Sequence, residues 1–100
     1  MTVDEFRATL AGGEPPQGAS TPLRALWLDG KGDWAGAHGI AQDVDTGPDA
    51  AIHAAIHAYL HRKEGDADNA GYWYRRAGRA VEERPLAEEW AGLVREALAG

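Results

Sequence analysis

Three histidines recur at every fourth position of one predicted helix: His53, His57 and His61. On a helix this spacing places the imidazole rings on one stripe, with neighbours about 6 Å apart. Two imidazoles four residues apart can bind one tetrahedral metal ion, because their ring nitrogens converge above the helix surface. Glu64 follows His61 by three residues and adds a carboxylate on the same side. The spacing therefore indicates a zinc site of His57, His61 and Glu64, which His38 could join from another helix.

The same histidine stripe has a second explanation in packing. It lies about 100° around the helix from the apolar stripe of Ile52, Ile56 and Leu60. An imidazole suits the edge of a buried face, since it packs like an apolar ring and still forms hydrogen bonds to a neighbouring helix. The His-Glu-x-x-His pattern of zinc proteases is absent. Both interpretations, metal ligands and structural histidines, stay open at the level of sequence.

Three consecutive aromatic residues, Tyr72, Trp73 and Tyr74, form the second chemically distinctive pattern. Consecutive helical residues point about 100° apart, so these three side chains cannot all enter one core. We expect Trp73 or Tyr74 in the core and Tyr72 beside a groove. Tyrosine and arginine are enriched at binding hot spots. We therefore predict a partner-binding groove made of Tyr72, Arg76, Arg62, His57 and His61.

The sequence contains no complete catalytic motif. Ser20 is the only serine, and no Gly-x-Ser-x-Gly surrounds it. The glycines at 30–33 read as a helix end and not as a phosphate-binding loop. We expect the acidic pairs Glu82-Glu83 and Glu88-Glu89 to be solvent-exposed. An enzymatic hypothesis, without a defined reaction, would use a polar site of His38, His57, Asp66 and Tyr74.

Composition limits the class of protein and its partners. The chain has 100 residues, enough for one domain, and a net charge of −6 with its basic residues set among acidic ones. Nucleic acid is therefore an unfavourable partner, because phosphate binding needs a basic face. There is no cysteine, which fits a reducing cytoplasm. No secretory signal and no run of roughly 20 apolar residues is present, so we expect a soluble cytoplasmic protein without a membrane partner.

The elements that must position these residues are short helices separated by glycine, proline and aspartate. Thr2 and Glu5 form a capping box, and Thr21-Pro22 has the pattern of a helix start. Gly32-Asp33 and Gly65-Asp66 each end one helix and begin the next. The alanine-rich helix before Gly65 suits a central position, because small side chains let several helices approach. We predict one all-α domain over 1–100, with about six short helices: an entry helix, hairpin 1 (21–45), hairpin 2 (48–82) and a capping helix (85–99).

A weak internal repeat of 33 residues superimposes Gly32-Asp33 on Gly65-Asp66. A helical hairpin repeated at this period resembles the tetratricopeptide class. Gly65, Ala70, Tyr74 and Ala77 stand at that family's glycine, alanine, aromatic, alanine spacing, and the run 70–77 resembles the end of a Sel1-like repeat. The resemblance implies a non-enzymatic module that binds a protein, a peptide or a second copy of itself as a homodimer.

A second resemblance covers the runs 57–66 and 69–77, together with Asp33-Trp34 and Ala37-His38. These stretches are similar to a group of small uncharacterised bacterial proteins. The similarity implies a bacterial origin and no particular activity. Three hypotheses therefore follow from the sequence: an interaction module, a small metal- or ligand-binding protein, and an enzyme of unknown reaction.

Overall fold

The computed structural model describes residues 1–44 and 46–100, and the regular structure in these residues is entirely helical. This confirms the prediction of an all-α fold with about six helices. No helix in this part of the chain combines the length and the apolar character that crossing a bilayer requires. The elements are α1 (Val3–Ala8), the 3₁₀ turn η1 (Thr9–Ala11), α2 (Thr21–Gly30), α3 (Trp34–Gln42), α4 (Ala50–Glu64), α5 (Ala67–Ala77) and α6 (Leu86–Ala99).

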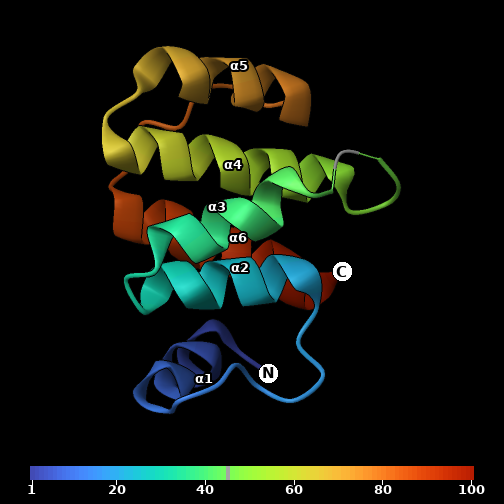
Figure 1. Ribbon diagram of the computed structural model, residues 1–100, viewed down its shortest axis with the longest axis vertical. Coiled ribbons are helices and arrows are strands. Elements are labelled where there is room, and N and C mark those ends of the chain that lie inside the picture. The colour runs from blue at the N-terminus through green and yellow to red at the C-terminus, as the bar shows by residue number, and fades with distance from the viewer. Residues whose placement is uncertain (45) are drawn as a thin grey trace.

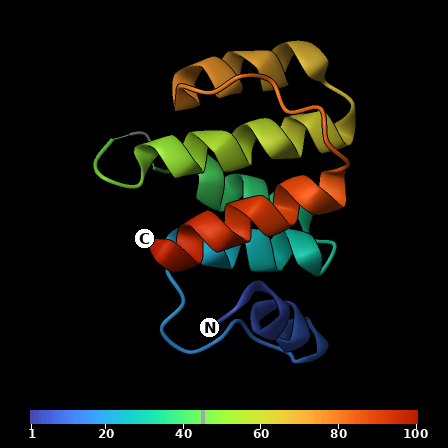
Figure 2. The same ribbon diagram turned by 180° about the vertical axis from the view of Figure 1, so that it is seen from behind.

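Helix α4 occupies the centre of the molecule, as its alanine-rich flanks predict. It contacts α2, α3, α5 and α6. Figure 1 shows α5 on one side of α4 and the α2–α3 pair on the other, with α1 at the far end. Figure 2, from behind, shows α6 crossing the back of this arrangement. The side chains of α4 are consequently buried almost all the way round the helix, from His53 to His61.

Two equivalent glycine–aspartate turns connect α2 to α3 and α4 to α5. Gly32 and Gly65 adopt left-handed conformations, with φ of 85° and 91°, which cost glycine little. The amide of the following aspartate, Asp33 or Asp66, donates to the carbonyl five residues earlier at 2.9 Å. Each aspartate carboxylate then accepts from the amide three residues later and caps the next helix. The repeat seen in the sequence therefore corresponds to one turn geometry used twice.

The N-cap of α2 lies one residue before Thr21, the N-cap that the Thr21-Pro22 pattern predicts. Ser20 caps this helix, with its hydroxyl accepting from the amide of Leu23 at 3.5 Å, and Thr21 is the first helical residue. The Thr21 hydroxyl instead pairs with Nε2 of His53 on α4, at 3.2 Å. The tertiary contact with His53 thus uses the oxygen that the sequence pattern assigned to the cap.

Two other helix limits also differ from the prediction. Helix α5 ends at Ala77 and not at 82, because Gly78 takes φ of 75° and closes the helix with the same type of glycine turn. Helix α4 begins at Ala50, two residues later than expected. The end predicted for hairpin 1 falls on Asp45, which lies outside the described residues.

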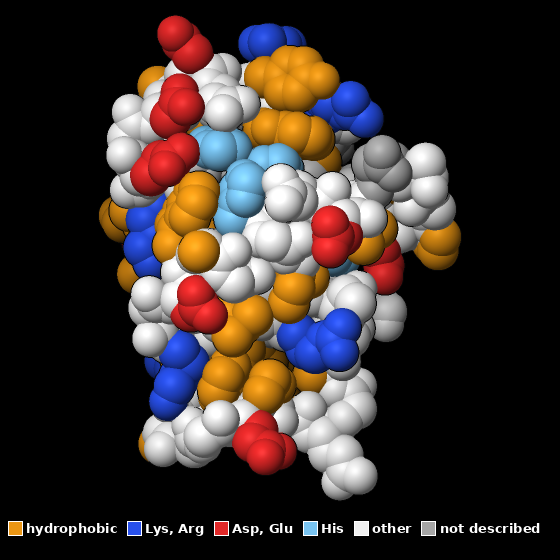
Figure 3. Space-filling view, in the orientation of Figure 1, with side chains coloured by type: hydrophobic (Ala, Val, Ile, Leu, Met, Phe, Trp, Pro, Cys, Tyr) orange, Lys and Arg blue, Asp and Glu red, His pale blue; other side chains and the backbone are white. Residues whose placement is uncertain are grey.

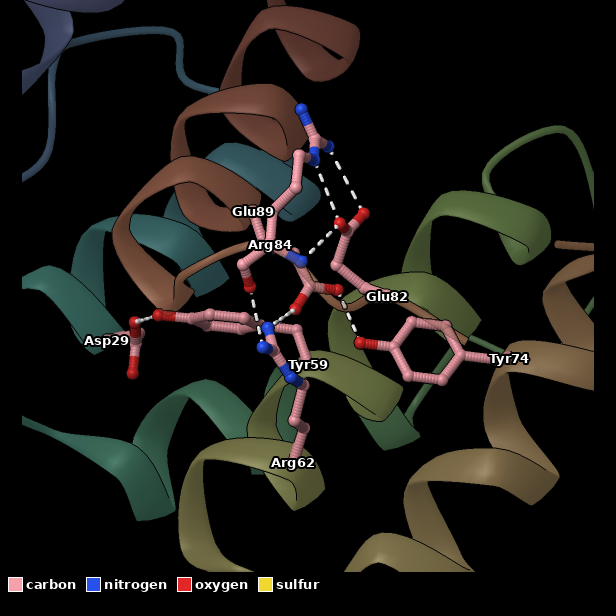
Figure 4. Close-up of polar contacts among 7 residues, drawn as sticks. All are labelled: Asp29, Tyr59, Arg62, Tyr74, Glu82, Arg84 and Glu89. Atoms are coloured by element: carbon pink, nitrogen blue, oxygen red, sulfur yellow. Dashed lines mark hydrogen bonds and ion pairs between the residues drawn. The ribbon is translucent and has the colours of Figure 1, made fainter. Parts of the chain in front are cut away.

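Two buried carboxylates tie the central helix to its neighbours (Figure 4). Glu89 on α6 is only 4% exposed, so the prediction that it is solvated is wrong. It accepts from the Tyr74 hydroxyl at 2.5 Å and from the Arg62 guanidinium at 2.9 Å. Tertiary packing overrides the expectation because α6 turns this residue of the Glu88-Glu89 pair inward, and its neighbour Glu88 stays exposed.

The second buried carboxylate, Asp29, lies near the C-terminal end of α2. It accepts from the Tyr59 hydroxyl at 2.6 Å and from the Lys63 ammonium at 2.9 Å. Burial, followed by the hydrogen bond to Asp29, raises the pKa of Tyr59 well above its ordinary range. The phenol is therefore a permanent donor at neutral pH, and the pair links α2 to α4.

We predict that Glu89→Ala lowers the free energy of unfolding by about 3 kcal/mol, because it leaves Arg62 and Tyr74 without their buried acceptor. Urea denaturation measures the change. Glu88→Ala, which removes the same group from an exposed position of the same helix, should change stability by less than about 0.5 kcal/mol. Equal effects for the two variants would contradict the structural role of Glu89.

We predict opposite effects for two Gly→Ala substitutions. Gly65→Ala should destabilise the protein by about 1 kcal/mol, because alanine is strained at φ of 91°. Gly39→Ala, inside α3 where an added Cβ meets no atom within 4 Å, should stabilise it by about 0.5–1 kcal/mol. Thermal unfolding of the two variants and the parent protein distinguishes these signs. A stabilising Gly65→Ala would contradict the turn geometry.

Candidate metal centre

Three histidines from two helices converge where α3 lies against α4. His57 and His61 project from successive turns of α4 and meet His38 from α3. The Nε2 atoms of His38 and His57 are 2.9 Å apart. One ring nitrogen from each of the three residues lies within 4.8 Å of the others. The i, i+4 pair of the sequence analysis therefore gains its third imidazole from a different helix.

The distances between these ring nitrogens are close to those between the nitrogen ligands of a tetrahedral zinc ion. Zn–N bonds of about 2.0–2.1 Å at tetrahedral angles place ligand nitrogens about 3.3 Å apart. The described nitrogens, between 2.9 Å and 4.8 Å apart, bracket this value. The geometry can thus hold one ion with three nitrogen ligands and a fourth position open.

Glu64, predicted as a ligand beside His57 and His61, contacts His61 and forms with His61 and Asp66 a second group whose ligand atoms lie within 4.8 Å of one another. Oε1 of Glu64 lies 2.6 Å from Nδ1 of His61, so the carboxylate accepts from that ring nitrogen. A proton held on Nδ1 leaves the lone pair on Nε2, which is the nitrogen available to a metal ion. Carboxylates in this position commonly orient metal-binding histidines. The geometry thus suits Glu64 as a positioning residue for His61.

Two tryptophan rings pack against the imidazoles of His38 and His57. Trp34 stacks on His38 with 4.8 Å between ring centroids, and its indole nitrogen donates to the Leu60 carbonyl at 2.8 Å. Trp73 on α5 stacks on His57 at 3.9 Å. The rings of His38 and His57 are therefore fixed by packing, as a preorganised ligand site requires.

Burial keeps the rings of His38 and His57 neutral. Burial first, and then the neighbouring His38 and His61, lower the pKa of His57 to about 4. Burial, with a contribution from His61, also lowers the pKa of His38. A neutral imidazole binds a metal ion without first losing a proton. Nδ1 of His57, like Nδ1 of His53 outside the cluster, has no hydrogen-bond partner in the described part of the chain.

His53, the first member of the histidine stripe, lies apart from the cluster. Its ring is fully buried and pairs through Nε2 with the Thr21 hydroxyl on α2. Burial lowers its pKa. The stripe is therefore divided: His53 links α4 to α2, and His57 and His61 face α3.

The residues of the predicted partner-binding groove are not all brought together. Tyr72 is 43% exposed, and its hydroxyl accepts from Arg76 at 3.1 Å. Arg62 lies on the α6 side of α4, where it donates to Glu89 and to the Arg84 carbonyl. His57 and His61 are buried beside α3. Only Tyr72 and Arg76 thus form an exposed pair.

Three of the four residues named for the enzymatic hypothesis lie in or beside the histidine cluster. His38 and His57 are in contact, and a carboxylate oxygen of Asp66 lies within 4.8 Å of a ring nitrogen of His61. Asp66 also caps α5 through the amide of Asn69. The hydroxyl of Tyr74, the fourth residue, bonds to Glu89 on the α6 side and does not join this group.

The histidine cluster reaches the molecular surface. Figure 3 shows histidine side chains between hydrophobic ones on the face formed by α3, α4 and α5. His38 is half-buried, whereas His57 and His61 are 4% and 7% exposed. The outer side of the cluster can therefore meet a ligand from solution.

The sequence predicted His38 as an additional metal ligand and as a member of the enzymatic site, but it did not assign Trp34 or Trp73 to the metal site. The spacing of Trp34 and His38, four residues apart on one helix, was an available signal for their stacking. Contact between Trp73 and His57 had no such signal, because the two residues lie on different helices.

Comparison with protein families, with curated proteins and with solved structures finds no match to this chain. The resemblance to tetratricopeptide and Sel1-like repeats therefore stays a prediction. Function has to be argued from the arrangement of the side chains.

We predict that the protein loses stability as the pH falls from 7 to 5. The pKa of His57 is about 4 in the folded protein and near 6.5 in the unfolded chain, so the unfolded chain binds the extra proton in this interval. His57 alone should contribute a loss of about 2 kcal/mol. Urea unfolding at both pH values measures it. In His57→Gln the loss should shrink by about that amount, and an unchanged loss would contradict the burial of a neutral imidazole.

Proposed function

We propose that this protein binds a divalent transition-metal ion through His38, His57 and His61, with zinc as the ion that suits the ligands. The observation that carries this proposal is the convergence of three buried or half-buried imidazoles, with ligand nitrogens within 4.8 Å of one another. Imidazole nitrogens favour zinc, copper and nickel over calcium and magnesium, which prefer oxygen. The metal ion would join α3 to α4 at the centre of the molecule.

Three further features support a metal site over purely structural histidines. The pKa values of His38 and His57 are lowered, so both rings are neutral at physiological pH. Glu64 accepts from Nδ1 of His61 in the arrangement found behind many zinc ligands. Trp34 and Trp73 hold the other two rings in place.

A second candidate is the cytoplasmic interaction module suggested by the sequence. It is favoured by Tyr72, one of few large hydrophobic side chains that are exposed among the described residues. Arg76 lies over its ring at 5.9 Å and donates to its hydroxyl. Tyrosine–arginine pairs are common in protein interfaces. Trp73 contacts both Tyr72 and Arg76 and also stacks on His57, so this surface adjoins the metal ligands and contains none of them.

We predict that zinc stabilises the parent protein against thermal unfolding. Free zinc at 100 times its dissociation constant should add about 2.7 kcal/mol, which corresponds to a rise in Tm of roughly 10 °C or more. His38→Gln should abolish this rise, because it removes the only ligand from α3. Calorimetric titration with zinc measures affinity and stoichiometry, which should be one ion per chain.

The matched control is His53→Gln. It removes an equally buried histidine of the same helix that lies outside the cluster. Zinc should raise its Tm as it does for the parent protein. An absence of zinc binding by the parent, or an equal loss in both variants, would contradict the proposal.

A further inference from the structure

A cavity adjoins the histidine cluster at the other end of the groove between α3 and α5. It has a volume of about 300 Å³ and lies over the first turns of α4. Ala41 of α3, Ala54 of α4 and Trp73 of α5 are among its walls. Trp73 also stacks on His57, so one side chain borders both the cluster and the cavity. Trp73 is therefore a wall that the cluster and the cavity share.

Helix geometry gives the spacing between the cluster and the cavity. Ala41 follows His38 by three residues, and Ala54 precedes His57 by three residues. Helices α3 and α4 run in opposite directions (Figure 1), so both steps lead the same way along the groove. Three residues of helix correspond to about 4.5 Å. The cavity therefore begins about one helical turn from the histidines along both helices.

The walls of the cavity select the chemistry of a ligand. Most of its described lining is apolar, with alanines, Val44, Pro48 and Trp73. Arg76 is the charged side chain of that lining, and no described carboxylate borders the cavity. An anion consequently meets no described negative charge there, and an apolar body meets an apolar surface.

We propose that the metal ion and this cavity together bind a small carboxylate with an apolar body. The inference rests on the proposed metal site. Three neutral imidazoles leave the ion with its full positive charge and one open position, which favours an anionic oxygen ligand. The carboxylate occupies that position, and the apolar body lies against Ala54 and Trp73. The volume of about 300 Å³ accommodates one aromatic ring or a branched alkyl chain.

The test uses the full chain loaded with Co²⁺, whose visible absorption reports on its ligands. Acetate and phenylacetate are titrated separately at constant pH and ionic strength. Both should change the spectrum, and phenylacetate should bind about tenfold more tightly, because its ring enters the cavity. Ala51→Leu, at an exposed position that lines the cavity, should reduce this preference to less than about threefold and leave the affinity for acetate unchanged.

Ala87→Leu, an equal enlargement of an exposed alanine on α6 outside the cavity, is the control and should retain the preference. Cobalt binding without a preference for phenylacetate would overturn this inference alone. Retention of the full preference for phenylacetate in Ala51→Leu would also overturn this inference alone. A failure to bind cobalt or zinc would overturn the proposed metal site, and this inference with it.

Discussion

The burial of α4 on all sides is the constraint on which the rest of the structure depends. Its residues from His53 to His61 are buried without interruption, so each polar side chain among them must find its partners inside the protein. Alanines on its flanks allow other helices to pack closely, and Ala58 with Ala70 brings α5 near. The apolar residues Ile56 and Leu60 face the main core. The helices around α4 must therefore provide the hydrogen-bond partners of its buried polar side chains.

Three polar side chains of α4 are accordingly paired with the neighbouring helices α2 and α6. Tyr59 bonds to Asp29 on α2, and His53 bonds to Thr21 at the start of the same helix. Arg62, near the end of α4, pairs with Glu89 on α6. These pairs fix how the helices sit around α4, since a shift of any neighbour would leave a buried charge or hydroxyl unpaired.

The face toward α3 is the one on which the functional proposals rest. There Nε2 of His57 shares a hydrogen bond with Nε2 of His38, and Nδ1 of His57, like Nδ1 of His53, has no partner in the described chain. Three imidazoles that meet in this way form a ligand set that suits a transition-metal ion. Trp73 borders both this cluster and the cavity beside it. The two proposed ligands, a metal ion and a carboxylate, would therefore bind side by side.

The sequence by itself determined the features that depend on neighbouring residues. The all-α class, the central helix and the paired glycine–aspartate turns at Gly32 and Gly65 follow from local conformational preferences and from the spacing of apolar residues. The proximity of His57 and His61 likewise follows from their spacing of four residues on one helix. The contact of Glu64 with His61 is also local, since the two residues lie three positions apart on α4. The tertiary structure alone decided that His38 joins the cluster and that Glu89 is buried while Glu88 is exposed. These facts depend on which helix packs against which, and at what rotation, and no local pattern encodes the relative rotation of helices that lie far apart in the chain.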